Sequence, residues 1–165
     1  MKNVNFEKIY CKYYKSIYRY LVAITKEVNI AEEITQETFF KALKNIDKYN
    51  PNKKMLTWLC EIAKNTYFSE YKKNKKFQKL SESEMEFEID NEQNIVEKII
   101  DNEDNSEILK ILHKLEEPYK EVFSLRVYGE LSFKQIGEIF DKSENWARVT
   151  YYRSKLKIKE SLKWI

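Results

Sequence analysis

Residues 131–158, LSFKQIGEIFDKSENWARVTYYRSKLKI, decide the fold that we predict for the C-terminal part of the chain. Ser132 and Gln135 have the spacing of a capping box, which begins a helix, and we expect this helix to end near Phe140. The Asp-Lys-Ser that follows is typical of a turn. Glu144 then places a carboxylate at the positive N-terminal end of a second helix. The pattern predicts a helix-turn-helix, in which the small Gly137 allows close approach.

The second helix of this pair has two faces of different chemistry. Ala147, Tyr151, Ser154 and Ile158 recur at helical spacing and are predicted to pack inward. The opposite face carries the candidate DNA-binding residues Asn145, Arg148, Val149, Tyr152, Arg153 and Lys155. In a major groove, arginine reads guanine edges and neighbouring cations hold phosphates. These residues alone leave open the alternative of an amphipathic packing helix with a solvated basic side.

Helical periodicity covers most of the remaining chain, and the 165 residues include only two glycines and two prolines. This composition favours long helices, so we predict an all-α fold. The expected helices are 5 to about 27, a second helix capped by Asn29 and ending near Asp47, a third from Met55 to Lys79, one capped by Ser106, and one with Pro118 in its first turn.

Charge divides the chain into three segments. Residues 1–80 carry 17 basic and 8 acidic side chains, whereas residues 81–105 carry 1 basic and 10 acidic ones. Residues 106–165 are again basic, with 12 basic against 9 acidic side chains. We therefore predict two small helical domains, 1–80 and 106–165, joined by a flexible acidic linker over 81–105. Basic domains of this kind suit a polyanionic partner.

No catalytic or metal site can be assembled from the sequence. Cys11, Cys60 and His113 cannot supply a usual zinc-ligand set, and we expect both cysteines to be buried thiols. The sequence gives no nucleophile with a base and an orienting acid, so we expect no enzyme activity, no cofactor, no metal and no small-molecule substrate. No apolar run approaches a membrane span and the N-terminus does not resemble a secretion signal, so we expect a cytoplasmic protein.

Two stretches resemble one known family. AEEITQETFFKAL (31–43) with LTWLCEIAKNTYFSEYKKNKK (56–76) closely resembles region two of bacterial sigma factors of the extracytoplasmic-function group. Residues 115–162 resemble region four of the same family. The resemblance covers most of the chain. It implies an alternative sigma factor that binds RNA polymerase core, through its clamp and flap regions, and directs it to promoter DNA.

The resemblance also implies roles for particular residues. The Q-E-T-F helix of the family docks on the polymerase clamp, which points here to Glu33, Gln36 and Glu37. The residues implied for the melted minus-ten element are Tyr49, Asn50, Lys53, Lys54, Met55 and Asn65. The helix-turn-helix is implied to read the minus-thirty-five element. Trp58, in the family's T-W-L motif, is expected to pack in the core.

The chain departs from the family at the start of the recognition helix, where Asn145-Trp146-Ala147 replaces the usual Gly-Thr-Val. The acidic linker either threads a basic RNA channel of the polymerase or acts as a plain tether. By resemblance we expect an anti-sigma factor, in many members of the family membrane-bound. The alternatives are a stand-alone helix-turn-helix regulator and a polymerase-binding mimic of a sigma factor.

Overall fold

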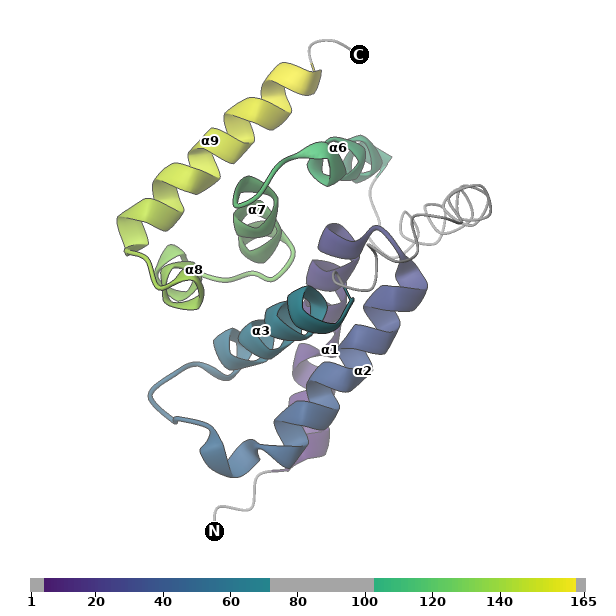
Figure 1. The fold of residues 1–165 in the computed structure, drawn as a ribbon, viewed down its shortest axis with the longest axis vertical. Helices are drawn as coiled ribbons and strands as arrows, with labels where there is room; N and C mark the ends of the chain where they lie inside the picture. The colour runs from purple at the N-terminus through teal and green to yellow at the C-terminus, as the bar shows by residue number, and fades with distance from the viewer. Residues whose placement is uncertain (1–4, 72–102, 163–165) are drawn as a thin grey trace.

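The structure, a computed structural model, describes residues 5–71 and 103–162, and these residues form helices with no β-strand among them (Figure 1). The first group comprises α1 (Phe6–Thr25), α2 (Val28–Lys44), η1 (Ile46–Lys48), α3 (Met55–Thr66) and η2 (Tyr67–Tyr71). The second group comprises α6 (Glu103–Lys114), α7 (Tyr119–Val127), α8 (Phe133–Phe140) and α9 (Glu144–Leu162). The all-α prediction is confirmed. Neither group contains a helix with the length and apolarity that a membrane span requires.

The first group packs α1, α2 and α3 around one another. Helical spacing brings the aliphatic side chains of Ile17, Leu21, Ile34 and Leu59 into its core, where each is completely buried. We refer to residues 5–71 as the N-terminal unit.

The junction between α1 and α2 differs from the prediction, because Asn29 lies inside α2 and does not cap it. Lys26 adopts a left-handed conformation, with φ of 67°, and ends α1. The Thr25 hydroxyl accepts a hydrogen bond from the Glu27 N–H at 3.3 Å, so the turn is complete before Asn29. Helix α2 therefore begins at Val28.

The second group, residues 103–162, forms the C-terminal unit and contains the predicted helix-turn-helix as α8 and α9. The Gln135 N–H donates to the Ser132 hydroxyl at 3.2 Å, and the Ser132 N–H donates to the Gln135 side chain at 2.7 Å. This confirms the capping box. A Cβ on Gly137 would lie 2.7 Å from the Lys142 carbonyl oxygen, so the turn needs glycine for its close approach to α8.

Four further expectations need correction or restriction. Ser106 lies inside α6, which begins at Glu103, so the last three residues of the predicted linker are helical. The remainder of the linker, 81–102, lies outside the described residues, as do positions 72–79 of the predicted third helix. Pro118 occupies the N-cap position of α7 and precedes its first turn.

The two cysteines differ. Cys60 is buried as expected, and its burial raises the pKa of the thiol. Cys11 is exposed, which contradicts the prediction, because it lies on the outer side of the first half of α1.

The two units contact each other along a seam. Helix α1 packs against α6 and α7, and α3 packs against α8. In Figure 1 the helix-turn-helix lies over α3, with α9 on the side of α8 away from the N-terminal unit. The seam brings the end of α8 close to Lys53 and Asn65, two of the residues that were predicted to bind the minus-ten element.

Candidate nucleic-acid interface

The outer face of α2 combines acidic and apolar side chains. Glu33 and Gln36 are exposed and Glu37 is half-buried, as their helical spacing predicted. Phe40 and Leu43 continue this face one and two turns later, and they are 60% and 51% exposed. Phe40 was not among the residues predicted from the sequence. Exposed large apolar groups next to charged ones are typical of protein interfaces.

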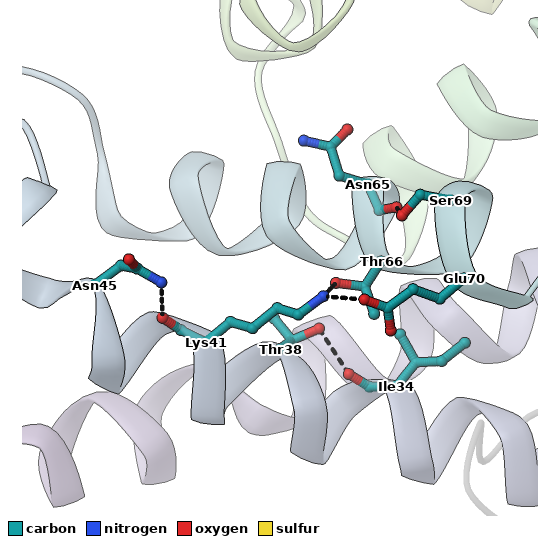
Figure 2. Close-up of polar contacts among 8 residues, drawn as sticks. All are labelled: Ile34, Thr38, Lys41, Asn45, Asn65, Thr66, Ser69 and Glu70. Atoms are coloured by element: carbon teal, nitrogen blue, oxygen red, sulfur yellow. Dashed lines mark hydrogen bonds and ion pairs between the residues drawn. The ribbon is translucent and has the colours of Figure 1, made fainter.

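Lys41 joins α2 to the end of α3. Its ammonium donates to the Thr66 hydroxyl at 3.1 Å and lies 2.6 Å from the Glu70 carboxylate (Figure 2). This contact makes Lys41 part of the packing between α2 and the end of α3, so it does not belong to the exposed outer face of α2. Figure 2 also shows that the side chain of Asn65 points away from α2, toward the C-terminal unit.

The loop before α3 is held by an aromatic pair. The ring of Tyr49 lies 5.0 Å from that of Trp58, and the Tyr49 hydroxyl donates to the Lys53 carbonyl. Burial, and secondarily the neighbouring Tyr13, raises the pKa of Tyr49. Trp58 is half-buried, so it packs as predicted, but against the loop and not in the centre of the core. This packing fixes the conformation of the loop.

Two of the six predicted minus-ten residues line one cavity of about 540 Å³. These are Lys53 and Asn65; the cavity is also lined by Lys64 and Glu61. Lys53 pairs with Glu61, its ammonium 2.7 Å and 3.0 Å from the two carboxylate oxygens. Lys64 was not among the residues predicted from the sequence, although its position next to Asn65 on the same helix, three residues after Glu61, was a signal for it.

The other four predicted residues, Tyr49, Asn50, Lys54 and Met55, are not among the residues that line this cavity. Asn50 and Lys54 are exposed, and Asn50 accepts a hydrogen bond from the Asn52 N–H at 3.0 Å, which shapes the turn. Met55 is the first residue of α3 and is half-buried. Tyr49, Asn50 and Lys54 therefore lie in the loop before α3, outside the lining of the cavity.

The outward face of α9 carries the predicted minus-thirty-five residues at its surface. Val149 and Tyr152 are 37% and 53% exposed. Asn145, Arg153 and Lys155 are exposed as well. The exposure of this set is what the sequence predicted.

Arg148 is held in place by two neighbours. Its guanidinium lies 3.2 Å from the Glu144 carboxylate and 5.4 Å from the centre of the Phe133 ring. Arg126 covers the same ring at 4.3 Å and donates to the Leu131 carbonyl at 3.0 Å. A cation over an aromatic ring is attracted by the ring's negative face. Arg126 was not predicted as part of this surface, because it lies on α7, outside the helix-turn-helix.

The inner face of α9 differs from the prediction at one position. Ala147, Ser154 and Ile158 are buried as expected, and Thr150 joins them. Tyr151 is only half-buried, with its ring 5.8 Å from Phe123. The inner face of α9 therefore packs through the Tyr151 ring as well as through small side chains.

Trp146 supports the start of the recognition helix. Its ring packs against that of Phe140, with 5.2 Å between the ring centres, and its backbone N–H donates to the Ser143 hydroxyl at 3.0 Å. Among residues 5–71 and 103–162, no three His, Cys, Asp or Glu side chains are grouped so that they could hold a metal ion.

Two family models match the chain in the order of these surfaces. The model of sigma-70 region 2 matches residues 9–77, and that of sigma-70 region 4 matches residues 105–158. The first match includes α2 and the loop before α3, and the second includes α8 and α9. A stand-alone helix-turn-helix regulator does not account for the region 2 match.

Curated relatives match over nearly the whole chain. The RNA polymerase sigma factor YlaC of Bacillus subtilis is 30% identical over 157 residues, which cover 94% of this chain and 91% of YlaC. The ECF RNA polymerase sigma factor SigM of the same organism is 28% identical over 154 residues, covering 93% of this chain and 92% of SigM.

Solved structures show the same fold. The sigma factor RpoE, in complex with the anti-sigma factor NepR from Bartonella quintana, has a TM-score of 0.75 at 16% identity and covers 96% of this chain and 97% of its own. CnrH, in complex with the cytosolic domain of CnrY, has a TM-score of 0.70 at 16% identity and covers 96% of this chain and 87% of its own. With both sigma-70 regions matched in order and relatives aligned end to end, the chain belongs to the bacterial RNA polymerase sigma factors of the extracytoplasmic-function group, which direct transcription initiation.

Proposed function

We propose that this sigma factor binds RNA polymerase core through the outer face of α2. Glu33, Gln36 and Glu37 supply polar contacts to the clamp, and the exposed Phe40 and Leu43 supply apolar anchors beside them. A large apolar side chain that becomes buried at the centre of an interface contributes much of the binding free energy. The acidic residues around it favour a basic partner surface and set the orientation.

The loop from Tyr49 to Met55, together with Asn65, is the proposed site for the melted minus-ten strand. Unpaired bases are held by stacking and by hydrogen bonds to their edges, which the aromatic pair and Asn65 suit. Lys53 and Lys64 place cations in the cavity that Asn65 also lines, where they are able to bind phosphate. Glu61 keeps Lys53 in this position through its ion pair.

The outward face of α9 is the proposed reader of the minus-thirty-five element. Arg148 and Arg153 carry guanidinium groups suited to guanine edges, and Val149 offers an apolar contact to thymine methyl groups. Glu144 and Phe133 keep Arg148 oriented before it meets DNA. Lys155 lies farther along the helix, where we assign it to a backbone phosphate.

The domain boundaries that we propose are 1–80, 81–105 and 106–165, with α6 extending to Glu103. The acidic linker either occupies a basic RNA channel of the polymerase or acts as a tether. The C-terminal unit also contacts the flap region of the polymerase. The RpoE relative is bound to an anti-sigma factor, and we propose such an inhibitor here. The protein acts in the cytoplasm and contributes no catalytic chemistry, since the polymerase forms the phosphodiester bonds.

One observation carries this proposal: an exposed acidic and apolar face lies within the region 2 match, and an exposed basic and aromatic face lies within the region 4 match. Run-off transcription with purified core polymerase and a library of promoter fragments from the source genome is the test. We expect specific transcripts that depend on this protein.

The matched binding experiment compares two double variants with the same change in charge. Glu33→Lys with Glu37→Lys is expected to abolish capture of core polymerase in a pull-down, whereas Glu107→Lys with Glu160→Lys, on exposed positions of α6 and α9, is expected to retain it. Circular dichroism checks that both keep their helices. If the α2 variant binds core as tightly as the parent protein, the assignment of this face is wrong.

A further inference from the structure

An apolar groove lies between α6, α7 and α9 of the C-terminal unit. Its volume is about 500 Å³, and Ile108, Phe123, Leu156 and Leu162 supply apolar side chains to its lining. We refer to it as the α9 groove. Leu156, on its α9 side, is 60% exposed, so the groove leaves a large apolar side chain in contact with water. Exposed apolar surface of this kind is typical of a binding site.

Two lysines give the α9 groove a positive charge. Lys155 and Lys159 are both exposed, and among the residues that the structure describes no acidic side chain lines the groove or pairs with either ammonium. The Lys155 ammonium lies 5.7 Å and 5.8 Å from the ring centres of Tyr151 and Tyr152. The groove therefore favours an occupant that is both apolar and acidic.

The other exposed apolar surface described above has the opposite charge. Phe40 and Leu43 lie on the face of α2 that also carries Glu33 and Glu37. An acidic segment would be repelled there, because like charges side by side raise the free energy of a complex. Of the two apolar surfaces, only the α9 groove has the charge that suits an acidic occupant.

The acidic linker contains a segment of matching chemistry. Residues 84–89, EMEFEI, alternate three glutamates with Met85, Phe87 and Ile89. They lie outside the described residues, and the pattern is that of their sequence. In an extended segment, period-two alternation places the apolar side chains on one side and the carboxylates on the other. One side of such a segment suits the apolar lining of the groove, and the other suits the two lysines.

The attachment of the linker keeps this segment within reach of the groove. Ile89 precedes Glu103, the first residue of α6, by 14 positions. A chain of this length spans up to about 46 Å when extended. Ile108, which lines the groove, lies five positions along α6 from Glu103, a rise of about 7.5 Å. Because a short tether holds a segment at an effective concentration in the millimolar range, modest contacts are sufficient for binding.

From the groove, its charge and the linker sequence, we infer that residues 84–89 bind in the α9 groove of the free protein. Their apolar side chains lie against Phe123 and Leu156, and their glutamates face Lys155 and Lys159. This inference goes beyond the proposed function, since the binding needs neither DNA nor polymerase. It has one consequence that does rest on the proposed function: Tyr152 and Lys155 also belong to the face assigned to the minus-thirty-five element, so the bound linker covers part of that face.

The test measures the effective concentration between the linker and the groove in the full chain. Ile89→Cys and Leu156→Cys are combined with Cys11→Ser; Cys60 remains, but it is buried, and burial raises the pKa of its thiol, so it reacts poorly. The protein is equilibrated in a glutathione redox buffer, in which oxidised glutathione accepts the two electrons of disulfide formation. Mass spectrometry after alkylation of the remaining thiols gives the fraction with an intramolecular disulfide.

We expect Phe87→Ser to lower this effective concentration about threefold, the change produced when the bound fraction of the linker falls from about two thirds to about one fifth. Val96→Ser is the matched control, because it removes an apolar side chain from the same linker outside residues 84–89 and should leave the value unchanged. No loss with Phe87→Ser, or an equal loss with Val96→Ser, would overturn the inference.

A second pair of thiols distinguishes the groove from a general compaction of the linker. Ile89→Cys is combined with Glu107→Cys, an exposed position of α6 that is not among the residues lining the groove. Here Phe87→Ser should not lower the effective concentration. An equal loss at both pairs would contradict the inference, as would disulfides formed mainly between two molecules, which would assign the groove to a second copy of the chain.

Binding to duplex DNA tests the consequence separately. On a promoter duplex found in the run-off experiment, and without the added cysteines, Phe87→Ser should bind about twofold more tightly than the parent, because the fraction with a free groove rises from about one third to about four fifths. Val96→Ser should bind as the parent does. If the disulfide experiment shows the linker in the groove but duplex affinity does not change, the inference stands and the assignment of Tyr152 and Lys155 to the minus-thirty-five face is wrong.

Discussion

Helices α1 and α9 are nearly equal in length, 20 and 19 residues, but they differ in how much of their surface is buried. The second half of α1, from Ile17 to Thr25, is buried at almost every position, because α2, α3, α6 and α7 surround it. Helix α9 buries only Ala147, Thr150, Ser154 and Ile158.

The small buried side chains of α9 let its backbone lie close to α7. The Ser154 hydroxyl lies within hydrogen-bond distance of both the Tyr119 carbonyl, at 3.1 Å, and the Thr150 carbonyl, at 2.9 Å. A helix held along one narrow face leaves its remaining circumference available for a ligand. Helix α1 therefore contributes mainly to the core, whereas α9 exposes most of its surface, as its proposed role in DNA binding requires.

The largest expected effect tests the structural role of α1. Leu21→Ala removes a side chain that is completely buried, and we expect it to lower the free energy of unfolding by about 2–5 kcal/mol. The matched change on α9 is Leu156→Ala, at a position 60% exposed, where we expect a change within about 0.5 kcal/mol. Urea denaturation followed by circular dichroism measures both. Similar losses of unfolding free energy for the two variants would show that Leu156 is buried more deeply than its exposed fraction indicates.

An intermediate effect tests the binding role of α9. Arg148→Ala should cost about 1–3 kcal/mol of binding at particular minus-thirty-five base pairs, because a bidentate contact to one base is lost. Lys155→Ala should weaken binding to all sequences alike and reduce the dependence of affinity on salt. Binding to duplexes with each base pair varied in turn distinguishes the two. A uniform loss for Arg148→Ala would make it a phosphate contact.

The smallest effect concerns the place where α1 meets the C-terminal unit. Burial, followed by the charges of Lys26 and Lys120, lowers the pKa of His113 from 6.5 to about 3, although the Val22 and Ala23 carbonyls oppose this shift. Between these two values the unfolded chain binds a proton that the folded chain excludes. The free energy of unfolding should therefore fall as the pH drops below 6.5, by at most about 1.4 kcal/mol per pH unit.

Thermal denaturation between pH 7 and about 5.5 isolates this contribution, because most carboxylates titrate at lower pH. The glutamine of His113→Gln does not titrate in this range. We therefore expect the melting temperature of this variant to depend less on pH than that of the parent. An identical slope in the parent and in His113→Gln would show that other groups cause the dependence.

Much of the helix-turn-helix could be predicted from the sequence, since local hydrogen bonds specify it. The capping box of Ser132 and Gln135 requires only residues three positions apart. The same reasoning was wrong for Asn29 and Ser106, because both residue types occur inside helices too, and the start of a helix depends on the preceding turn. The exposed face of α9 followed from helical periodicity alone.

The sequence alone could not predict which of two neighbouring apolar residues on α2 is buried and which is exposed. Phe39 is 2% exposed and Phe40 is 60% exposed, although they are identical side chains in adjacent positions. Leu43, another large apolar residue of this helix, is half exposed. The difference depends on where α1 and α3 cover the helix, which is tertiary information. The contact between Lys64 and Phe140 was beyond sequence reasoning for the same reason, since 76 positions separate them.

Gly137 has a consequence at the level of the gene. Every single-nucleotide missense change of a glycine codon introduces an amino acid with a Cβ atom. At this position that atom would meet the Lys142 carbonyl oxygen at 2.7 Å and the Ser143 carbonyl oxygen at 2.9 Å, both of them backbone atoms that no change of rotamer can move aside. The codon for residue 137 therefore has no neutral missense neighbour, and descendants of this gene that keep the tight turn will keep the glycine.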